Sequence, residues 1–212
     1  IDDAGYNDFG FMGSKEMQTP NIDALTSEGV VFTDAHVAAT VSSPSRACLI
    51  TGRYGHRFGY ECNLSDRTNG LPLEEETIAE VFKTNGYRTA AIGKWHLGSR
   101  DEQHPNNRGF DLFYGMKAGG RDYFYNEKKS DRPGDERNLL LNDRQVKFEK
   151  YLTDAFSEKA VEFINESSQP FMMYLAYNAV HTPMQATDED MAKFEGHPRQ
   201  KLAAMTLSLI HI

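Results

Sequence analysis

The chain is poor in cysteine, in tryptophan and in long apolar stretches. Of its 212 residues, two are cysteine and one is tryptophan. Cys48 and Cys62 are too few for a disulfide framework, and they do not reveal the redox compartment. No apolar run approaches the roughly 20 residues that a membrane-spanning helix needs. We therefore expect no membrane span.

The chain also lacks an excess of basic residues. It has 23 lysines and arginines against 31 aspartates and glutamates, which gives a formal net charge of −8. This balance argues against nucleic acid as a partner. An anionic substrate would have to be held by a local basic pocket. The hydrophobic content of 39% and charged content of 25% are typical of a globular protein, and the length suffices for one sizeable core.

Helix and strand signals alternate along the chain without an internal repeat. Proline near a helix start and glycine at its end mark several of the boundaries. We expect helices over residues 20–28, 44–51, 77–85 and 153–165, with another beginning at 191, and strands over 30–32, 88–92 and 171–177. This alternation predicts an α/β fold in which helices sandwich a mostly parallel sheet.

An acidic pair, Asp2 and Asp3, stands at the start of the chain. We expect Ile1 to be the last residue of a strand, so that the chain would begin inside an element as a fragment does. Both carboxylates would then lie at the carboxyl edge of the sheet, where α/β proteins bind ligands. Two readings stay open: a site for a hard divalent cation, which would relieve the repulsion between them, or two solvated loop acids.

The segment Ser42-Ser43-Pro44-Ser45-Arg46 has the signals of a helix start, with Ser43 as a cap and Pro44 in the first turn. Such a start favours an anion, and Arg46 follows Ser42 by one turn. Ser42 and Arg46 are therefore candidates to meet a tetrahedral oxyanion. The alternative is that these serines only cap a helix.

Two further candidate groups follow strands. Lys94 and His96 come just after the strand expected at 88–92, and continued extended geometry would put them on one side with Trp95 facing away. His181 follows the strand expected at 171–177. A lone histidine at such a position is more often structural than catalytic, so both roles remain open for His181.

Residues 117–143 are rich in glycine and charged residues and show no period. We expect them to form a long excursion near the mouth of the site, where specificity would reside. Arg121, Asp122 and Tyr125 are its candidates for substrate contact. We treat residues 1–212 as a single partial domain, and the last six residues, 207–212, as a non-native tail.

Four strings together resemble the type I, formylglycine-dependent sulfatases of the alkaline-phosphatase-like superfamily. Residues 42–53 match the signature (Cys or Ser)-x-Pro-Ser-Arg-x-x-Leu-x-Thr-Gly-Arg at eight positions. Residues 93–98, Gly-Lys-Trp-His-Leu-Gly, resemble the second signature of that family. The acidic start and the His181-Thr182-Pro183 segment are also similar to family segments. The resemblance implies an alkaline-phosphatase-like fold that lacks its first strand and its C-terminal part.

The resemblance also implies roles for these residues. Ser42, and not Cys48, would be oxidised to formylglycine, whose hydrate attacks the sulfur and later expels sulfate. Asp2, Asp3 and Ser42 would bind Ca²⁺, although these ligands are too few for the ion. Arg46 would orient the hydrate and Lys94 would neutralise the sulfuryl charge. His181 would protonate the leaving oxygen, and His96 would remove the proton that triggers sulfate release.

By the same resemblance, the activity would be hydrolysis of sulfate esters on a sulfated carbohydrate. A serine at position 42 implies maturation by an anaerobic radical sulfatase-maturating enzyme, or else an engineered Cys→Ser change. A periplasmic or secreted location is expected from the family, and this fragment alone is expected to be inactive. Two other functions stay open: a phosphonate monoester or phosphodiester hydrolase, and a non-catalytic protein that binds sulfated glycans.

Overall fold

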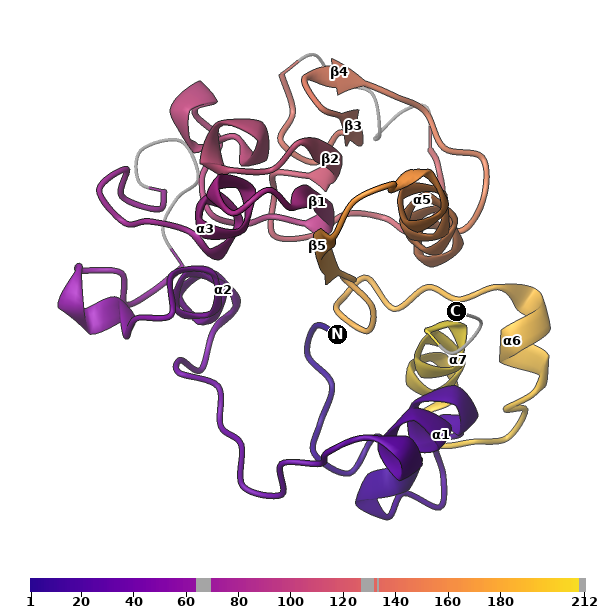
Figure 1. Cartoon of the computed structure of the whole chain (residues 1–212). Helices are drawn as coiled ribbons and strands as arrows, with labels where there is room; N and C mark the ends of the chain where they lie inside the picture. Colours follow the sequence, from indigo (N-terminus) through magenta and orange to yellow (C-terminus); the bar gives the residue numbers. More distant parts are fainter. Residues whose placement is uncertain (64–69, 127–131, 133, 210–212) are drawn as a thin grey trace.

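The fold is a five-stranded mixed sheet with helices on both faces (Figure 1). In this computed structural model the structure describes residues 1–63, 70–126, 132 and 134–209. The strands are β1 (Arg88–Lys94), β2 (Leu112–Met116), β3 (Leu140–Leu141), β4 (Arg144–Gln145) and β5 (Phe171–Ala176). The helices are α1 (Pro20–Glu28), α2 (Ser42–Thr51), α3 (Ile78–Thr84), α5 (Leu152–Glu166), α6 (Asp188–Ala192) and α7 (Gln200–Ser208).

The sheet has the order β4-β3-β2-β1-β5 and is parallel across its three longest strands. β1 lies between β2 and β5, and β3 and β4 extend the β2 side as short antiparallel strands. This arrangement confirms the predicted mostly parallel α/β class. Because β1 and β5 are parallel neighbours, their carboxyl ends, which carry Lys94 and Ala176, meet at one edge.

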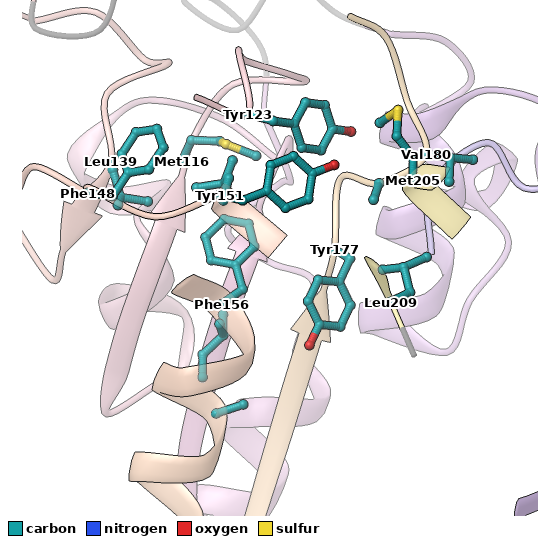
Figure 2. Close-up of a cluster of buried hydrophobic side chains, with 14 residues drawn as sticks. Met116, Tyr123, Leu139, Phe148, Tyr151, Phe156, Tyr177, Val180, Met205 and Leu209 are labelled. Carbon is teal, nitrogen blue, oxygen red and sulfur yellow. The ribbon is translucent and has the colours of Figure 1, made fainter. Parts of the chain in front are cut away.

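Successive residues of β1 serve opposite faces of the sheet. Ala91 packs with residues of α2 and α3, including Ala47 and Ala79, in one buried cluster. Ile92 packs on the other face with Phe156 of α5 in a second cluster. Figure 2 shows this second cluster, which includes Tyr123, Tyr151 and Tyr177.

All four helices predicted with both ends form as the sequence indicates, apart from one or two residues at their ends. Thr77 accepts from the backbone N–H of Glu80 while the Glu80 side chain accepts from Thr77, so a capping box begins α3. Pro20 begins α1 and Gly29 ends it. In the tail, a short α6 precedes α7 where we expected one helix to begin.

The strand expected at residues 30–32 is wrong. These residues form no strand, and the side chains of Val30 and Phe32 are 83% and 78% exposed. β-branched and aromatic residues favour a strand only where a neighbouring strand and a buried face receive them. This segment runs instead as an open connection between α1 and α2 (Figure 1).

The two boundaries proposed within the chain stay predictions. Of the excursion at 117–143, residues 127–131 and 133 lie outside the described residues, and its end forms β3. Of the tail at 207–212, residues 210–212 also lie outside. Leu207 and Leu209 are 8% and 4% exposed and pack into the core. Across the described part of the chain, no helix combines the length and apolarity needed to cross a membrane.

Candidate active site

The first turn of α2 presents Ser42 to two basic side chains. The helix begins at Ser42 after Val41, which makes no side-chain cap, and the backbone N–H of Ser43 donates to Asn63 Oδ1 at 2.9 Å. The Ser42 Oγ accepts from Arg46 Nε at 3.2 Å and lies 3.3 Å from His96 Nδ1. The reading in which these serines only cap a helix is therefore wrong, because the Ser42 hydroxyl faces a cationic group and an imidazole.

Ser43 also has a different role from the expected cap. Its hydroxyl donates to the backbone carbonyl of His96 at 2.7 Å and lies 2.7 Å from the Tyr60 hydroxyl. Ser43 is 2% exposed, so these bonds are sheltered from water. Ser43 thus fixes the loop after β1 against α2, which sets the distance between His96 and Ser42.

Arg46 joins α2 to the sheet. Its Nη1 donates to the Lys94 carbonyl at 2.8 Å and to the Tyr174 hydroxyl at 3.0 Å. Its Nη2 lies 3.4 Å from Oδ1 of Asp2. A guanidinium can make these contacts together with the bond to Ser42 because its donors point in several fixed directions.

Lys94 ends β1 with its ammonium buried. Its Nζ donates to Oδ2 of Asp2 at 2.5 Å, and neither side chain is more than 7% exposed. Burial alone would raise the pKa of the Asp2 carboxyl, but the charges of Arg46 and Lys94 outweigh burial and lower that pKa. Asp2 is thus a carboxylate held between two cations.

His96 lies beyond the end of β1 and departs from the extended path that we expected. Its φ is +57°, yet it faces Ser42 while Trp95 is buried among core residues that include Phe110. Lys94 and His96 thus lie on the side of the site and Trp95 on the core side, as predicted, although the left-handed backbone of His96 replaces the expected extended geometry. Burial, followed by the charges of Lys94 and Arg46, lowers the pKa of His96 to about 4. The imidazole is neutral at pH 7 and is able to accept a proton.

Asp3 and His181 form a neighbouring pair. Residues 1–3 run beside the segment after β5, since Asp2 and Ala179 share one backbone hydrogen bond at 2.9 Å and Asp2 and Val180 another at 2.8 Å. Oδ2 of Asp3 consequently lies 3.8 Å from Nε2 of His181. The Nδ1 of His181 is 2.6 Å from the Thr182 carbonyl, which fixes the proton on Nδ1 and the ring orientation.

The candidates outside the excursion are thus brought to one edge of the sheet. Ser42, Arg46, Lys94, His96 and Asp2 are linked by direct contacts. Asp3 and His181 lie alongside through the backbone pairing of Asp2. A cavity of about 910 Å³ borders Asp2, Asp3, Ser42 and Arg46. Of the three candidates in the excursion, Arg121 and Asp122 line a second cavity beside His181, whereas Tyr125 packs against Phe148.

Sequence reasoning missed three residues that hold the two histidines. A Cβ on Gly119 would lie 2.7 Å from Cε1 of His96, and one on Gly120 would lie 3.3 Å from Cε1 of His181. The Tyr123 hydroxyl donates to the carbonyls of Asn178 and His181 at 2.6 and 2.8 Å. The signal that could have revealed the glycines is the Gly119-Gly120 pair just after an apolar run; Tyr123 gave none.

Asp2, Asp3 and Ser42 offer the kind of ligand atoms that a hard cation prefers, but too few of them to complete its coordination shell. Asp2, Asp3 and Ser42 offer carboxylate and hydroxyl oxygens, which Ca²⁺ prefers, whereas the ion takes about six to eight of them. Within the ranges that the structure describes, no group of three or more His, Cys, Asp and Glu side chains is arranged to hold a metal. These three residues can therefore supply only part of a coordination shell.

Comparison with known proteins agrees with the resemblance to sulfatases noted in the sequence. The sulfatase family model matches residues 1–204. Arylsulfatase G of Mus musculus is 37% identical over 88% of this chain and 41% of its own length. The uncharacterized sulfatase YdeN of Escherichia coli (strain K12) is 37% identical over 79% of this chain and 33% of its own length.

Solved structures agree with the fold. The crystal structure of Ps i-CgsB in complex with k-i-k-neocarrahexaose superposes with a TM-score of 0.92 at 42% identity, covering 99% of this chain and 51% of that one. The structure of BT4656 in complex with its substrate D-glucosamine-2-N,6-O-disulfate gives a TM-score of 0.76 at 26% identity, covering 92% of this chain and 36% of that one. The chain thus spans about half or less of the relatives it matches. With the family model covering nearly its whole length, the chain belongs to the sulfatase family, with the mostly parallel alkaline-phosphatase-like fold.

Proposed function

We propose that the protein hydrolyses sulfate esters of carbohydrates at the site formed by Ser42, Arg46, Lys94, His96 and His181. The observation that carries this proposal is the position of the Ser42 hydroxyl, within 3.3 Å of both Arg46 Nε and His96 Nδ1. A nucleophilic oxygen, cations for an anionic group and a neutral base are the components that ester hydrolysis of a sulfate requires.

Ser42 would act after oxidation to formylglycine, whose hydrate offers two hydroxyls in place of one. Arg46 Nε would orient the attacking oxygen, because it already donates to Ser42 Oγ. The buried Lys94 ammonium would neutralise charge on the sulfuryl oxygens. The neutral His96 imidazole would accept the proton from residue 42 during sulfate release.

His181 would protonate the leaving oxygen. Because Nδ1 of His181 is engaged by the Thr182 carbonyl, Nε2 is the nitrogen that faces the site and Asp3. A protonated Nε2 donating to the departing alkoxide would make that oxygen a better leaving group. Asp3 would support the protonated ring by its negative charge.

Asp2, Asp3 and Ser42 would contribute oxygen ligands to a Ca²⁺ ion, with other ligands completing the shell. When bound, the ion supplies Lewis-acid stabilisation of negative oxygen. Without it, the Asp2 carboxylate is balanced by Lys94 and Arg46.

A sulfated carbohydrate is the substrate class that the relatives support, since two structural neighbours were solved in complex with k-i-k-neocarrahexaose and with D-glucosamine-2-N,6-O-disulfate. The partner that oxidises Ser42 would be an anaerobic radical maturating enzyme. A periplasmic or secreted location also belongs to this proposal.

Two measurements test the proposal. Mass spectrometry of the peptide containing Ser42 should show a loss of two hydrogens, about 2 Da, after co-expression with a maturating enzyme. The matured full-length enzyme should release sulfate from 4-nitrophenyl sulfate faster than it cleaves the corresponding phosphonate ester, and Ser42→Ala should abolish the release. An unmodified Ser42 in a protein that binds sulfated sugar without turnover would contradict catalysis, and a preference for the phosphonate would change the reaction class.

A further inference from the structure

His181 borders a second cavity that Ser42 and Lys94 do not line. This cavity has a volume of about 480 Å³, and its walls include Gly120, Arg121, Asp122, Arg137 and His181. The volume falls within the range of small-molecule sites. When the sulfate ester of one sugar residue lies beside His181, the neighbouring sugar residue could therefore occupy this cavity.

Arg121 is one of the residues in the wall of this cavity. The residue is 6% exposed, and its Cζ lies 4.6 Å from the centre of the Phe148 ring. Its Nε donates to the Asp122 carbonyl at 3.4 Å. Packing against Phe148 restricts a side chain that is otherwise rich in rotamers, so a ligand that binds it loses less entropy.

Arg137 reaches the same cavity from the far end of the excursion. Asp135 accepts from its Nε at 2.9 Å and from its Nη2 at 2.6 Å, which fixes the plane of the guanidinium. The side chain is nonetheless 53% exposed and lines the cavity. Two arginines therefore line one space together with the carboxylate of Asp122, and Asp135 pairs with Arg137 beside it.

Asp122 supplies a hydrogen-bond acceptor. Its Oδ1 accepts from Gln185 Nε2 at 3.0 Å, and the Gln185 Oε1 accepts from the backbone N–H of Tyr123 at 2.7 Å. These bonds hold Asp122 in place beside the two arginines. Fixed cations with one fixed acceptor suit a sugar that carries an anionic group together with free hydroxyls.

We propose that this cavity is a second anion subsite, in which Arg121 and Arg137 bind a sulfate group other than the one being hydrolysed. The inference rests on the proposed function and deepens it, because it assigns the enzyme to carbohydrates with at least two sulfates. Selectivity for such a substrate would come from the excursion after β2, whose Gly120 also packs against the ring of His181.

The test is a binding ratio. Every protein carries Ser42→Ala, so that no turnover interferes, and calorimetry gives the Kd for sucrose octasulfate and for glucose 6-sulfate. Without a further change, the octasulfate should bind more tightly. The measured ratio is the Kd of glucose 6-sulfate divided by the Kd of sucrose octasulfate. Arg121→Gln should lower this ratio by about tenfold, as the loss of one charge-assisted contact does. Arg137→Gln should lower it by about threefold, because its site is half-exposed and screened.

Arg144→Gln is the matched control, since it removes the same charge from an exposed position on β4 and should leave the ratio unchanged. If both cavity variants match this control, or if the parent protein shows no preference for the octasulfate, the subsite is refuted. Should Arg121→Gln fail to fold, which its melting curve would reveal, Arg137→Gln decides alone. The ratio requires no sulfate release, so a failure of the proposed catalysis would be seen separately.

Discussion

The Lys94 ammonium is fully buried and donates to the Asp2 carboxylate at 2.5 Å, which joins the end of the central strand to the start of the chain. Neither group is solvated enough to stand alone, so each depends on the other. Arg46 Nη2, at 3.4 Å from the same carboxylate, shares the charge. Stability and chemistry are therefore coupled at this pair.

Replacing Lys94 with methionine should destabilise the protein by about 3 kcal/mol, because it leaves a buried carboxylate with only the more distant Arg46. Lys83→Met is the matched control: Lys83 pairs with Asp111 at 2.7 Å, but these side chains are 49% and 37% exposed. Its loss should cost less than about 1 kcal/mol. Urea unfolding measures both, and equal losses would show that burial does not determine the strength of these pairs.

Arg46→Lys should preserve the charge but lose catalysis. One ammonium cannot reach Ser42 and the Tyr174 hydroxyl together with the Lys94 carbonyl, as the guanidinium does. We expect kcat/KM for 4-nitrophenyl sulfate to fall by about 100-fold, since the attacking oxygen loses its orientation. Tyr174→Phe removes only one of these acceptors and should cost much less. A similar loss in both variants would assign the effect to packing around Tyr174.

The sequence was sufficient to predict the residues at the ends of β1 and β5. Glycines flank the segment from Lys94 to Leu97 at the end of β1, and His181 follows the apolar run of β5 by five residues. Because the two strands are parallel neighbours, their carboxyl ends meet, which brings the histidines to one edge. The sequence also located α3 to within one residue at each end, whereas its capping box became visible only in the structure.

Other parts depend on tertiary contacts that no local pattern contains. β2 was not predicted, and Gly115 within it makes a poor strand residue in isolation. Glycine is required at this position by the neighbouring strand β1, because a Cβ at Gly115 would lie 1.9 Å from the Gly93 carbonyl oxygen. Strands β3 and β4 have two residues each, too few for any periodicity. Likewise, the sequence predicted Ser43 as a helix cap, because local rules do not include its hydrogen bond to the distant His96 carbonyl.

Gly119→Ala should reduce turnover by distorting His96. The added Cβ would lie 2.7 Å from Cε1 and 2.8 Å from Nε2 of that ring, so the imidazole must move relative to Ser42. Gly120→Ala is the control, because its nearest contact on His181 is 3.3 Å and needs only a small adjustment. We expect kcat to fall by about tenfold to 100-fold in the first variant, and less in the second. The reverse order would show that His181, rather than His96, is the more tightly constrained ring.

The low pKa of His96 predicts how stability depends on pH. The folded protein binds this proton only near pH 4, whereas the unfolded chain binds it near pH 6.5. Between these values the unfolded state holds more protons, so the stabilisation is fully present above pH 6.5 and is lost as pH falls toward 4. The shift corresponds to at most about 3 kcal/mol. Urea unfolding in EDTA at pH 7 and pH 4.5 should therefore show the advantage of the wild type over His96→Gln shrinking by up to that amount. His36→Gln, which removes an exposed imidazole, tests whether burial is the cause. A wild-type advantage over His96→Gln that is the same at both pH values would mean that the folded protein admits the proton at its ordinary pKa, and that the ring is not the neutral base proposed for it.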